Sequence, residues 1–171
     1  AARCTGTSCR AAVRCCADHG TMTDHIADRM LCDPYAAMAE CSSASNCTSL
    51  GWRLDIAGTG DVAVCGESEV PSTVAGADSA GCTSDASWAT ADAICLSAGA
   101  RLCTVEELEA DETAGTGCGF DAALSWSRDN LNCSTGQHTA VIGRSTSSAS
   151  CMTCVAGTTV CLPDSTPSAV R

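Results

Sequence analysis

The sequence contains few aromatic side chains and no lysine. Five of its 171 residues are aromatic, and these are Tyr35, Trp52, Trp88, Phe120 and Trp126. A core made chiefly of alanine, serine, threonine and glycine buries little apolar area per residue, so hydrophobic burial alone is a weak source of stability. All nine basic residues are arginine, which we interpret as a compositional bias rather than a functional signal.

Long apolar runs are also absent. No segment approaches the roughly 20 apolar residues that cross a bilayer, so we predict that the chain has no membrane span of its own. No signal peptide is visible, so we expect a mature, processed chain. The net charge of −11 argues against nucleic acid and anionic membrane surfaces as partners.

Cysteine, in contrast, is abundant. An even set of sixteen cysteines in an acidic chain predicts disulfides and an oxidising, extracytoplasmic compartment. One disulfide typically contributes about 2–4 kcal/mol, so even half of the eight possible bonds would exceed the usual net stability of a domain. The candidate disulfide cysteines are Cys4, Cys9, Cys15, Cys16, Cys32, Cys41, Cys47, Cys65, Cys82, Cys95, Cys103, Cys118, Cys133, Cys151, Cys154 and Cys161. We expect the adjacent Cys15 and Cys16 to form two separate bonds.

A metal site is the alternative use of these cysteines. Zinc sites typically pair two CxxC motifs, or combine one CxxC with two closely spaced histidines. Here Cys151 and Cys154 form the only CxxC, and the three histidines of the chain supply no HxxxH motif. A redox role for this CxxC is disfavoured because it lacks a strand-to-helix context. We therefore predict no metal and no cofactor.

The clearest helix lies in "SWATADAICLSAGARLC". Trp88, Ala91, Ile94, Cys95 and Ala98 fall on one helical stripe, and the glycine that follows them suits a helix end.

A second helix is predicted at "TVEELEA", where Thr104 and Glu107 form a capping box. The surrounding acidic residues suit the first turns of this helix, where the helix dipole favours negative charge. Further helices are expected over residues 24–31 and from Asp33, and strands over residues 62–64, 101–103, 122–127, 139–143 and 158–162.

These elements predict an α+β fold, with short helices on a small antiparallel sheet and many loops. We expect residues 1–46 to be an N-terminal cysteine-rich segment that ends a preceding repeat unit. Residues 47–171 would form the main unit, with a long Gly/Ala/Ser-rich loop over residues 67–81.

Several short motifs resemble a cysteine-rich repeat of large secreted proteins from marine single-celled algae. They are "LGW" at 50–52, "VCGES" at 64–68, "GARLCT" at 99–104 and "GTGCGFD" at 115–121, and "AAVRCCAD" at 11–18 resembles the closing motif of such a repeat. The resemblance covers residues 47–171. It implies no activity that can be transferred to this chain.

The closing motif raises a question, because residues 168–171 read "SAVR" and stop where the motif would continue with two cysteines. One explanation, which we favour here, is that the chain is a fragment of a longer repeat protein. The other is that Cys15 and Cys16 fold back to complete the C-terminal unit. This second explanation predicts a disulfide from one of them to Cys82 or a later cysteine.

The segment from Trp88 to Leu102 also resembles, more distantly, the opening of a C-type lectin-like domain. That resemblance implies a disulfide from Cys95 to a cysteine on the last strand, and a later pair among Cys133, Cys151, Cys154 and Cys161. The EPN or QPD tripeptide and the WND-like strand of calcium-dependent sugar sites are missing. The resemblance therefore argues against calcium-dependent sugar binding.

Few residues stand out as binding candidates. We predict a weak binding surface that includes Trp52, Trp126, His19 and His25, where a histidine could also bind the magnesium of a pigment. The acidic residues Asp61, Glu67 and Glu69 lack the spacing of a calcium loop and are interpreted as solvated loop residues. Asn46 and Asn132 match the glycosylation pattern, but each precedes a cysteine whose disulfide would compete with modification.

We therefore expect a non-enzymatic, disulfide-stabilised interaction or structural module of an extracytoplasmic assembly, with other protein subunits as partners. One alternative is a soluble lumenal subunit that docks on an algal photosystem and stabilises it. The other is a calcium-independent carbohydrate-binding domain in which Trp88 or Trp126 stacks on a glycan.

Overall fold

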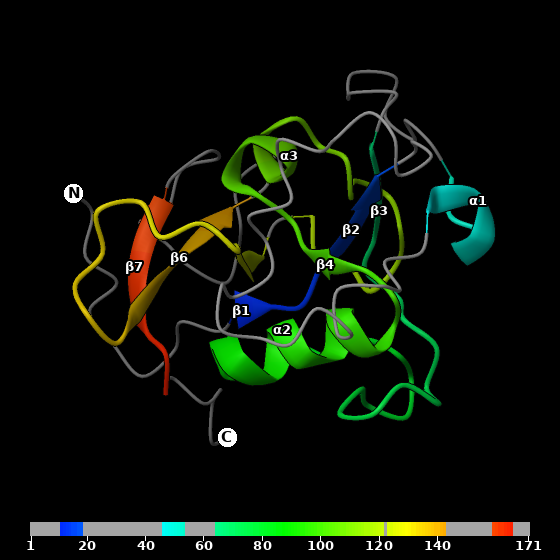
Figure 1. Cartoon of the computed structure of the whole chain (residues 1–171), viewed down its shortest axis with the longest axis horizontal. Coiled ribbons are helices and arrows are strands. Elements are labelled where there is room, and N and C mark those ends of the chain that lie inside the picture. Colours follow the sequence, from blue (N-terminus) through cyan, green and yellow to red (C-terminus); the bar gives the residue numbers. More distant parts are fainter. Residues whose placement is uncertain (1–10, 19–45, 54–63, 122, 143–158, 166–171) are drawn as a thin grey trace, which may run out of the picture.

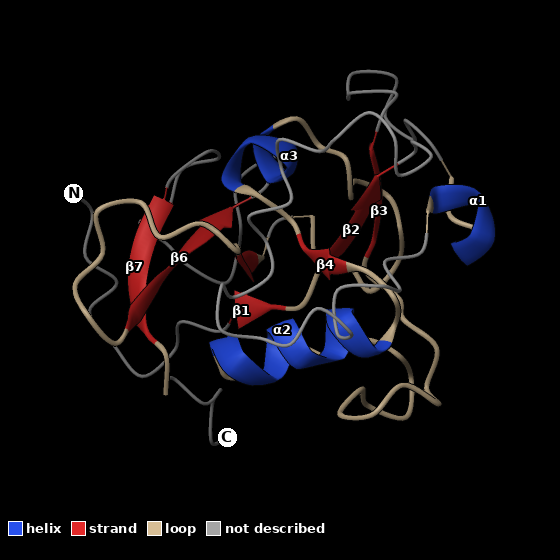
Figure 2. Ribbon diagram, viewed as in Figure 1, coloured by secondary structure: helices blue, strands red, loops and turns tan. Residues whose placement is uncertain are grey.

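The fold contains two small sheets, and residues 11–18 supply one strand to each of them (Figures 1 and 2). The computed structural model describes residues 11–18, 46–53, 64–121, 123–142 and 159–165. The first sheet contains, in spatial order, β1 (Ala11–Ala12), β5 (Leu124–Trp126), β6 (Gln137–Ile142) and β7 (Thr159–Pro163). The second contains β3 (Val64–Glu67), β2 (Cys15–Asp18) and β4 (Arg101–Leu102). The three helices of these residues are α1 (Cys47–Leu50), α2 (Trp88–Ser97) and α3 (Val105–Glu109), so the predicted α+β class is confirmed.

Both faces of β2, the central strand of the second sheet, are buried, and each face carries a disulfide to a different part of the chain. Successive side chains of a strand point to opposite faces of its sheet. Cys15 and Ala17 accordingly pack in the main hydrophobic core, while Cys16 packs in a smaller cluster with Leu108 of α3. Cys15 is bonded to Cys95 of α2 on one face, and Cys16 to Cys103 on the other. The alternation explains why these adjacent cysteines form two separate disulfides, as predicted.

Helix α2 runs beside β4 and covers the main core (Figure 1). The predicted stripe is present, with Ala91, Ile94 and Cys95 fully buried and Trp88 and Ala98 partly buried. Ser87 caps the start of the helix, because its side-chain oxygen accepts a hydrogen bond from the backbone N–H of Thr90. Gly99, at φ 81°, follows the last turn. The sequence pattern thus predicted this helix correctly.

Helix α3 packs against β6 and begins with the predicted capping box. The Thr104 hydroxyl accepts from the N–H of Glu107 at 3.1 Å, and the Glu107 carboxylate accepts from the N–H of Thr104 at 2.8 Å. Arg101 donates two hydrogen bonds to the same carboxylate, at 2.6 and 2.8 Å. The Glu107 carboxylate therefore caps the start of α3 and forms an ion pair with Arg101.

Strands β4 to β7 lie close to their predicted positions, β3 shares only Val64 with the strand predicted over residues 62–64, and β1 and β2 were not predicted as strands. The sheets also differ from the single antiparallel sheet that we expected. There are two sheets, and β1 pairs with β5 in parallel. The two-residue β1 can run parallel to β5 because more than a hundred residues of chain separate the two strands. Residues 68–81 contain no helix or strand and so form the predicted long loop.

Some expectations fall outside the described residues. They concern the helices over 24–31 and from Asp33, the CxxC motif, and the residues His19, His25 and Asp61. The boundary between residues 46 and 47 stays a prediction, although residues 11–18 already lie within the sheets of the main unit. Within the described ranges, no helix is both long enough and apolar enough to cross a membrane.

Candidate functional site

Ten of the candidate cysteines form five disulfides. These are Cys15–Cys95, Cys16–Cys103, Cys47–Cys65, Cys82–Cys118 and Cys133–Cys161. The remaining candidates, Cys4, Cys9, Cys32, Cys41, Cys151 and Cys154, lie outside the described residues. The bonds of Cys15 and Cys16 to residues beyond Cys82 are those that the fold-back explanation predicted. Residues 11–18 are therefore joined to the predicted main unit by two disulfides.

The disulfide that the lectin-like resemblance implied for Cys95 is wrong. Cys95 lies on the buried face of α2, in the same core cluster as Cys15 of β2, and is bonded to Cys15 rather than to a cysteine of β7. A later pair from the expected set is present, because Cys133 is bonded to Cys161 of β7.

Trp126 is not a surface residue, and this part of the predicted binding surface is wrong. Its side chain is 0% exposed, and its indole N–H donates to the Ala86 carbonyl at 2.8 Å. Both faces of β5 are covered, so a strand residue on either face is buried. Trp88 is partly buried, stacks on His138 with ring centroids 3.7 Å apart, and donates to the Ser127 carbonyl. Neither indole offers the free stacking platform that the carbohydrate hypothesis required of it.

Trp52, in contrast, lines a cleft of about 450 Å³. The cleft is also lined by Glu67 at the end of β3, by Glu69 and Pro71, and by Thr116. The N–H of Trp52 donates to the carbonyl of Cys47 at 3.0 Å. Since α1 ends at Gly51 with φ 72°, this hydrogen bond fixes the direction in which the chain leaves the helix. The Cys47–Cys65 disulfide then ties α1 to β3.

A polar network forms the floor of this cleft. The Thr116 hydroxyl accepts from the N–H of Ser68 at 2.9 Å, lies 2.7 Å from the Ser68 hydroxyl, and donates to the Thr113 carbonyl. The Thr113 hydroxyl in turn accepts from Arg14 at 2.6 Å. Arg14 is only 2% exposed and also pairs with Asp121 at 2.6 Å. Arg14 itself does not line the cleft, although its charge and that of Glu67 attract each other.

Two carboxylates stand at the cleft. One oxygen of Glu67 accepts from the N–H groups of Ser68 and Glu69, at 2.9 and 3.1 Å. Burial raises the pKa of Glu67 above its ordinary value, the Glu69 charge raises it further, and the two backbone hydrogen bonds act in the opposite direction. Glu67 is therefore half-buried and not the solvated loop residue that we expected, whereas Glu69 is exposed.

The side chain of Glu69 passes close to two glycines. A Cβ atom at Gly81 would lie 3.3 Å from the Glu69 Cγ, and one at Gly117 would lie 3.3 Å from Glu69 Oε2. Both glycines have positive φ, and each precedes a cysteine of the Cys82–Cys118 disulfide. This disulfide therefore joins the two turns that leave room for the Glu69 carboxylate.

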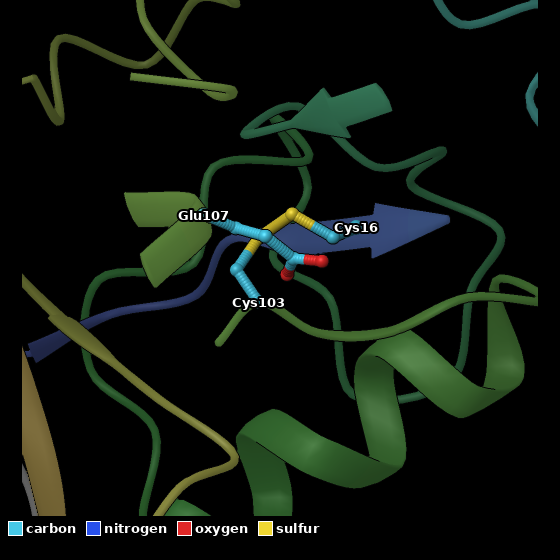
Figure 3. Close-up of side chains that lie close together, drawn as sticks. All are labelled: Cys16, Cys103 and Glu107. Carbon is cyan, nitrogen blue, oxygen red and sulfur yellow. A yellow bond between two sulfur atoms is a disulfide. The ribbon is translucent and has the colours of Figure 1, made fainter. Parts of the chain in front are cut away.

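A possible metal-ligand cluster lies at Cys16, Cys103 and Glu107 (Figure 3), where the candidate ligand atoms are within 4.8 Å of one another. It is the single such group of three or more among the described residues. Its two sulfur atoms are joined in a disulfide, and Glu107 is held by Arg101 and Thr104. In this oxidised form the cluster offers no thiolate and does not fit a metal.

A second cluster surrounds His138. The imidazole Nδ1 lies 2.6 Å from the Asp164 carboxylate, and one ring face is covered by Trp88. Burial raises the pKa of nearby Asp92, while Arg128 and His138 lower it. The stacking and the hydrogen bond to Asp164 join α2, β6 and the end of β7, which supports a structural function for this histidine.

The glycosylation candidates are both next to bonded cysteines. Asn46 caps α1, since its side-chain oxygen accepts from the N–H of Ser49 at 2.9 Å, and Cys47 is bonded to Cys65. Asn132 is exposed at a positive φ of 58°, and Cys133 is bonded to Cys161. The competition that we predicted from the sequence therefore applies to both sites.

Sequence reasoning selected Trp52 but missed the residues that complete its cleft. Thr116 and Ala80 come from turns far from Trp52 along the chain. The spacing of Glu67 and Glu69 was the one local signal, because residues two apart in an extended segment lie on the same side.

The comparisons with known proteins give no relative for this chain. No protein-family model matches it, and neither the curated proteins nor the solved structures contain a match.

Proposed function

We propose that the protein is a non-enzymatic, disulfide-stabilised interaction module of an extracytoplasmic protein assembly. The observation that carries this proposal is the covalent frame around the loops. Three disulfides connect β2 and β7 to α2 or to neighbouring segments, namely Cys15–Cys95, Cys16–Cys103 and Cys133–Cys161. The other two, Cys47–Cys65 and Cys82–Cys118, join segments that supply residues to the Trp52 cleft. Such bonds persist in oxidising compartments.

A frame of this kind suits recognition. Loops that are already held in one conformation lose little conformational freedom on binding, so more of the interaction free energy appears as affinity. The cleft lies on these fixed loops, and Trp52, an aromatic type enriched at protein interfaces, forms part of its wall.

The non-enzymatic part of the proposal is supported by what lines the cleft. Its described lining residues include two carboxylates and three hydroxyl groups but no histidine, cysteine or basic side chain. His138, which could act as a base, is instead paired with Asp164 and stacked on Trp88. The Thr116 hydroxyl lies near Glu67, but its hydrogen bond is donated to the Thr113 carbonyl, which argues against its activation as a nucleophile.

The carbohydrate hypothesis now depends on Trp52 rather than on Trp88 or Trp126. An aromatic side chain beside carboxylates can contact a sugar without calcium, so Trp52 favours this as the second candidate function. Membership of the algal repeat family and the choice between cell exterior and thylakoid lumen stay predictions.

Carbodiimide cross-linking of native material tests the proposal. This reagent joins a carboxylate to an amine, and the chain has no lysine, so a bond from its Asp or Glu to a lysine must lead to another protein. We expect reproducible bonds to one or a few partner subunits, identified by mass spectrometry. A photosystem partner would select the lumenal alternative. If the native chain acquires no lysine bond while known neighbours in the same sample are cross-linked, the interaction function is wrong.

A further inference from the structure

The Trp52 cleft has a composition that suits one class of ligand. We propose that it binds the cationic side chain of a lysine or arginine in a basic segment of a partner protein. This inference rests on the proposed function, because it names the chemistry of the partner that the interaction module would bind.

The first argument is the excess of negative charge at the cleft. Glu67 and Glu69 both line it, and none of its described lining residues is basic. The buried Arg14 is attracted to the Glu67 charge, but it does not line the cleft, and its guanidinium donates hydrogen bonds to Thr113 and Asp121. The whole chain carries a net charge of −11 and has no lysine. A cation from another molecule would relieve the repulsion between the two carboxylates and would be attracted by the field of the whole protein.

The second argument is the aromatic wall. An ammonium or guanidinium group over the face of a tryptophan is attracted by the negative face of the ring. Trp52 is half-buried, and its backbone is held by the α1 end and by the hydrogen bond to the Cys47 carbonyl. The methylene stem of a lysine or arginine could lie against Pro71 and Val70, which also line the cleft. Aromatic, aliphatic and anionic parts of the cleft thus match the three parts of a basic side chain.

The third argument is preorganisation. Glu67 is fixed by two backbone N–H groups, and Glu69 lies against Gly81 and Gly117 beside the Cys82–Cys118 disulfide. The Glu67 carboxylate therefore need not be rearranged when the ligand arrives, which preserves affinity. A neutral sugar could stack on Trp52, but it would leave both negative charges uncompensated in a half-buried cleft.

The test uses the purified, oxidised chain and a tetralysine peptide blocked at both ends, with binding measured by calorimetry. The comparison probe is the same peptide with every lysine acetylated, and a neutral oligosaccharide series is titrated in parallel. We expect tetralysine to bind with an affinity that falls as salt is added, and the acetylated peptide and the sugars not to bind.

Two sets of variants locate the site. Glu67→Gln/Glu69→Gln should weaken tetralysine binding about tenfold, whereas the control Glu106→Gln/Glu109→Gln removes the same charge from α3 and should change it less than about twofold. Trp52→Leu should weaken binding about two- to fivefold. Thermal unfolding of each variant shows whether the fold is kept, and the Glu pair keeps the test valid if Trp52→Leu does not fold.

Carbodiimide cross-linking of the tetralysine complex gives the site independently. We expect the bond at Glu69, the exposed carboxylate of the cleft, and not at Glu106. Equal losses in the α3 control and the cleft variants would show attraction to the net charge alone and overturn the proposal. Sugar binding that depends on Trp52 would also overturn it.

The two proposals can fail separately. If native material shows partner bonds only at carboxylates outside the cleft, the interaction function stands and the cationic cleft is wrong. If tetralysine binds in the cleft but the native chain has no partner, the cleft chemistry stands and the interaction function is wrong.

Discussion

Arg14 brings a full positive charge into a core that consists mainly of small residues. Its guanidinium is 2% exposed, whereas the paired Asp121 is 36% exposed. Burial lowers the pKa of Arg14, and the hydrogen bond and charge of Asp121 oppose that effect. Removing Asp121 and removing Arg14 should therefore destabilise the fold by different amounts. Water can reach the Asp121 carboxylate when Arg14 is absent, but it cannot reach the Arg14 guanidinium when Asp121 is absent.

Removing the carboxylate should cost more than removing the cation. Asp121→Ala leaves the Arg14 charge buried and unpaired, so we expect a loss of about 3 kcal/mol in the free energy of unfolding. Arg14→Met leaves a carboxylate that water reaches and the Thr113 hydroxyl, so we expect about 1–2 kcal/mol. Urea unfolding followed by circular dichroism measures both. An equal or larger loss for Arg14→Met would contradict the asymmetry.

Glu67 should make stability depend on pH. The folded state raises its pKa above the ordinary 4.5, so the folded chain holds this proton more tightly than the unfolded chain. The free energy of unfolding should then fall as the pH rises from about 4.5 through the raised pKa. Glu67→Gln lacks this loss, so its stability relative to the wild type should increase over the same range and then level off. A constant difference between pH 4 and pH 8, in urea titrations, would contradict the pKa direction.

At the scale of elements, the two disulfides of β2 enclose almost the same stretch of chain. Their sequence separations are 80 and 87 residues. While either bond is present, the other closes only a small additional ring of the unfolded chain. Removing one of the two bonds therefore leaves the large loop closed by the other, and the measured loss of stability includes only the small ring.

This overlap predicts a non-additive loss of stability. Cys15→Ala/Cys95→Ala and Cys16→Ala/Cys103→Ala should each cost about 2–3 kcal/mol, and the combined variant should cost about 2 kcal/mol more than their sum. Chemical unfolding of the three variants measures the difference. Cys133→Ala/Cys161→Ala, combined with either single pair, is the matched control and should be additive. Additive losses for the β2 pair would contradict the shared-loop explanation.

The elements differ in how far the sequence could predict them. The apolar stripe of α2 and the capping box of α3 are local signals, and both elements formed as predicted. The position of β2 between β3 and β4 is not local, since "AVRCCAD" gives no indication of its strand partners. The same holds for Cys95, whose partner depends on which strand lies under α2. Trp126 was misplaced because β5 is buried on both faces, so alternation carried no information there.

The cleft shows the same limit at one site. Trp52 could be selected because it is one of five aromatic residues, and the pair Glu67 and Glu69 was visible as charge. Their meeting with Thr116 depends on turns that are brought together by Cys82–Cys118. The lining residues come from loops that are far apart along the chain, so no local sequence pattern could predict the cleft.

For the whole molecule, stability should depend on the oxidised state. The core contains many alanines and cysteines and has one fully buried tryptophan, Trp126. A core of this kind supplies limited apolar burial, so we expect the reduced chain to unfold. Loss of the near-ultraviolet dichroism of Trp126 on adding a strong reductant at neutral pH would show this. A reduced chain that keeps this signal and a cooperative thermal transition would contradict it.

The β2 disulfides also decide how the chain would carry a mechanical load. A pull between Ala11 and Ser165 reaches Cys15 and Cys16 after a few residues and crosses directly to Cys95 and Cys103. On the shortest covalent path residues 17–102 are bypassed, and Cys82–Cys118 adds a second connection in parallel with residues 104–117. Cys133–Cys161 bypasses residues 134–160 in the same way. Even after its hydrogen bonds break, the chain can lengthen only over residues 104–132 and its short ends. Under tension the oxidised protein is therefore a tether of short, limited length, and reduction would release the rest.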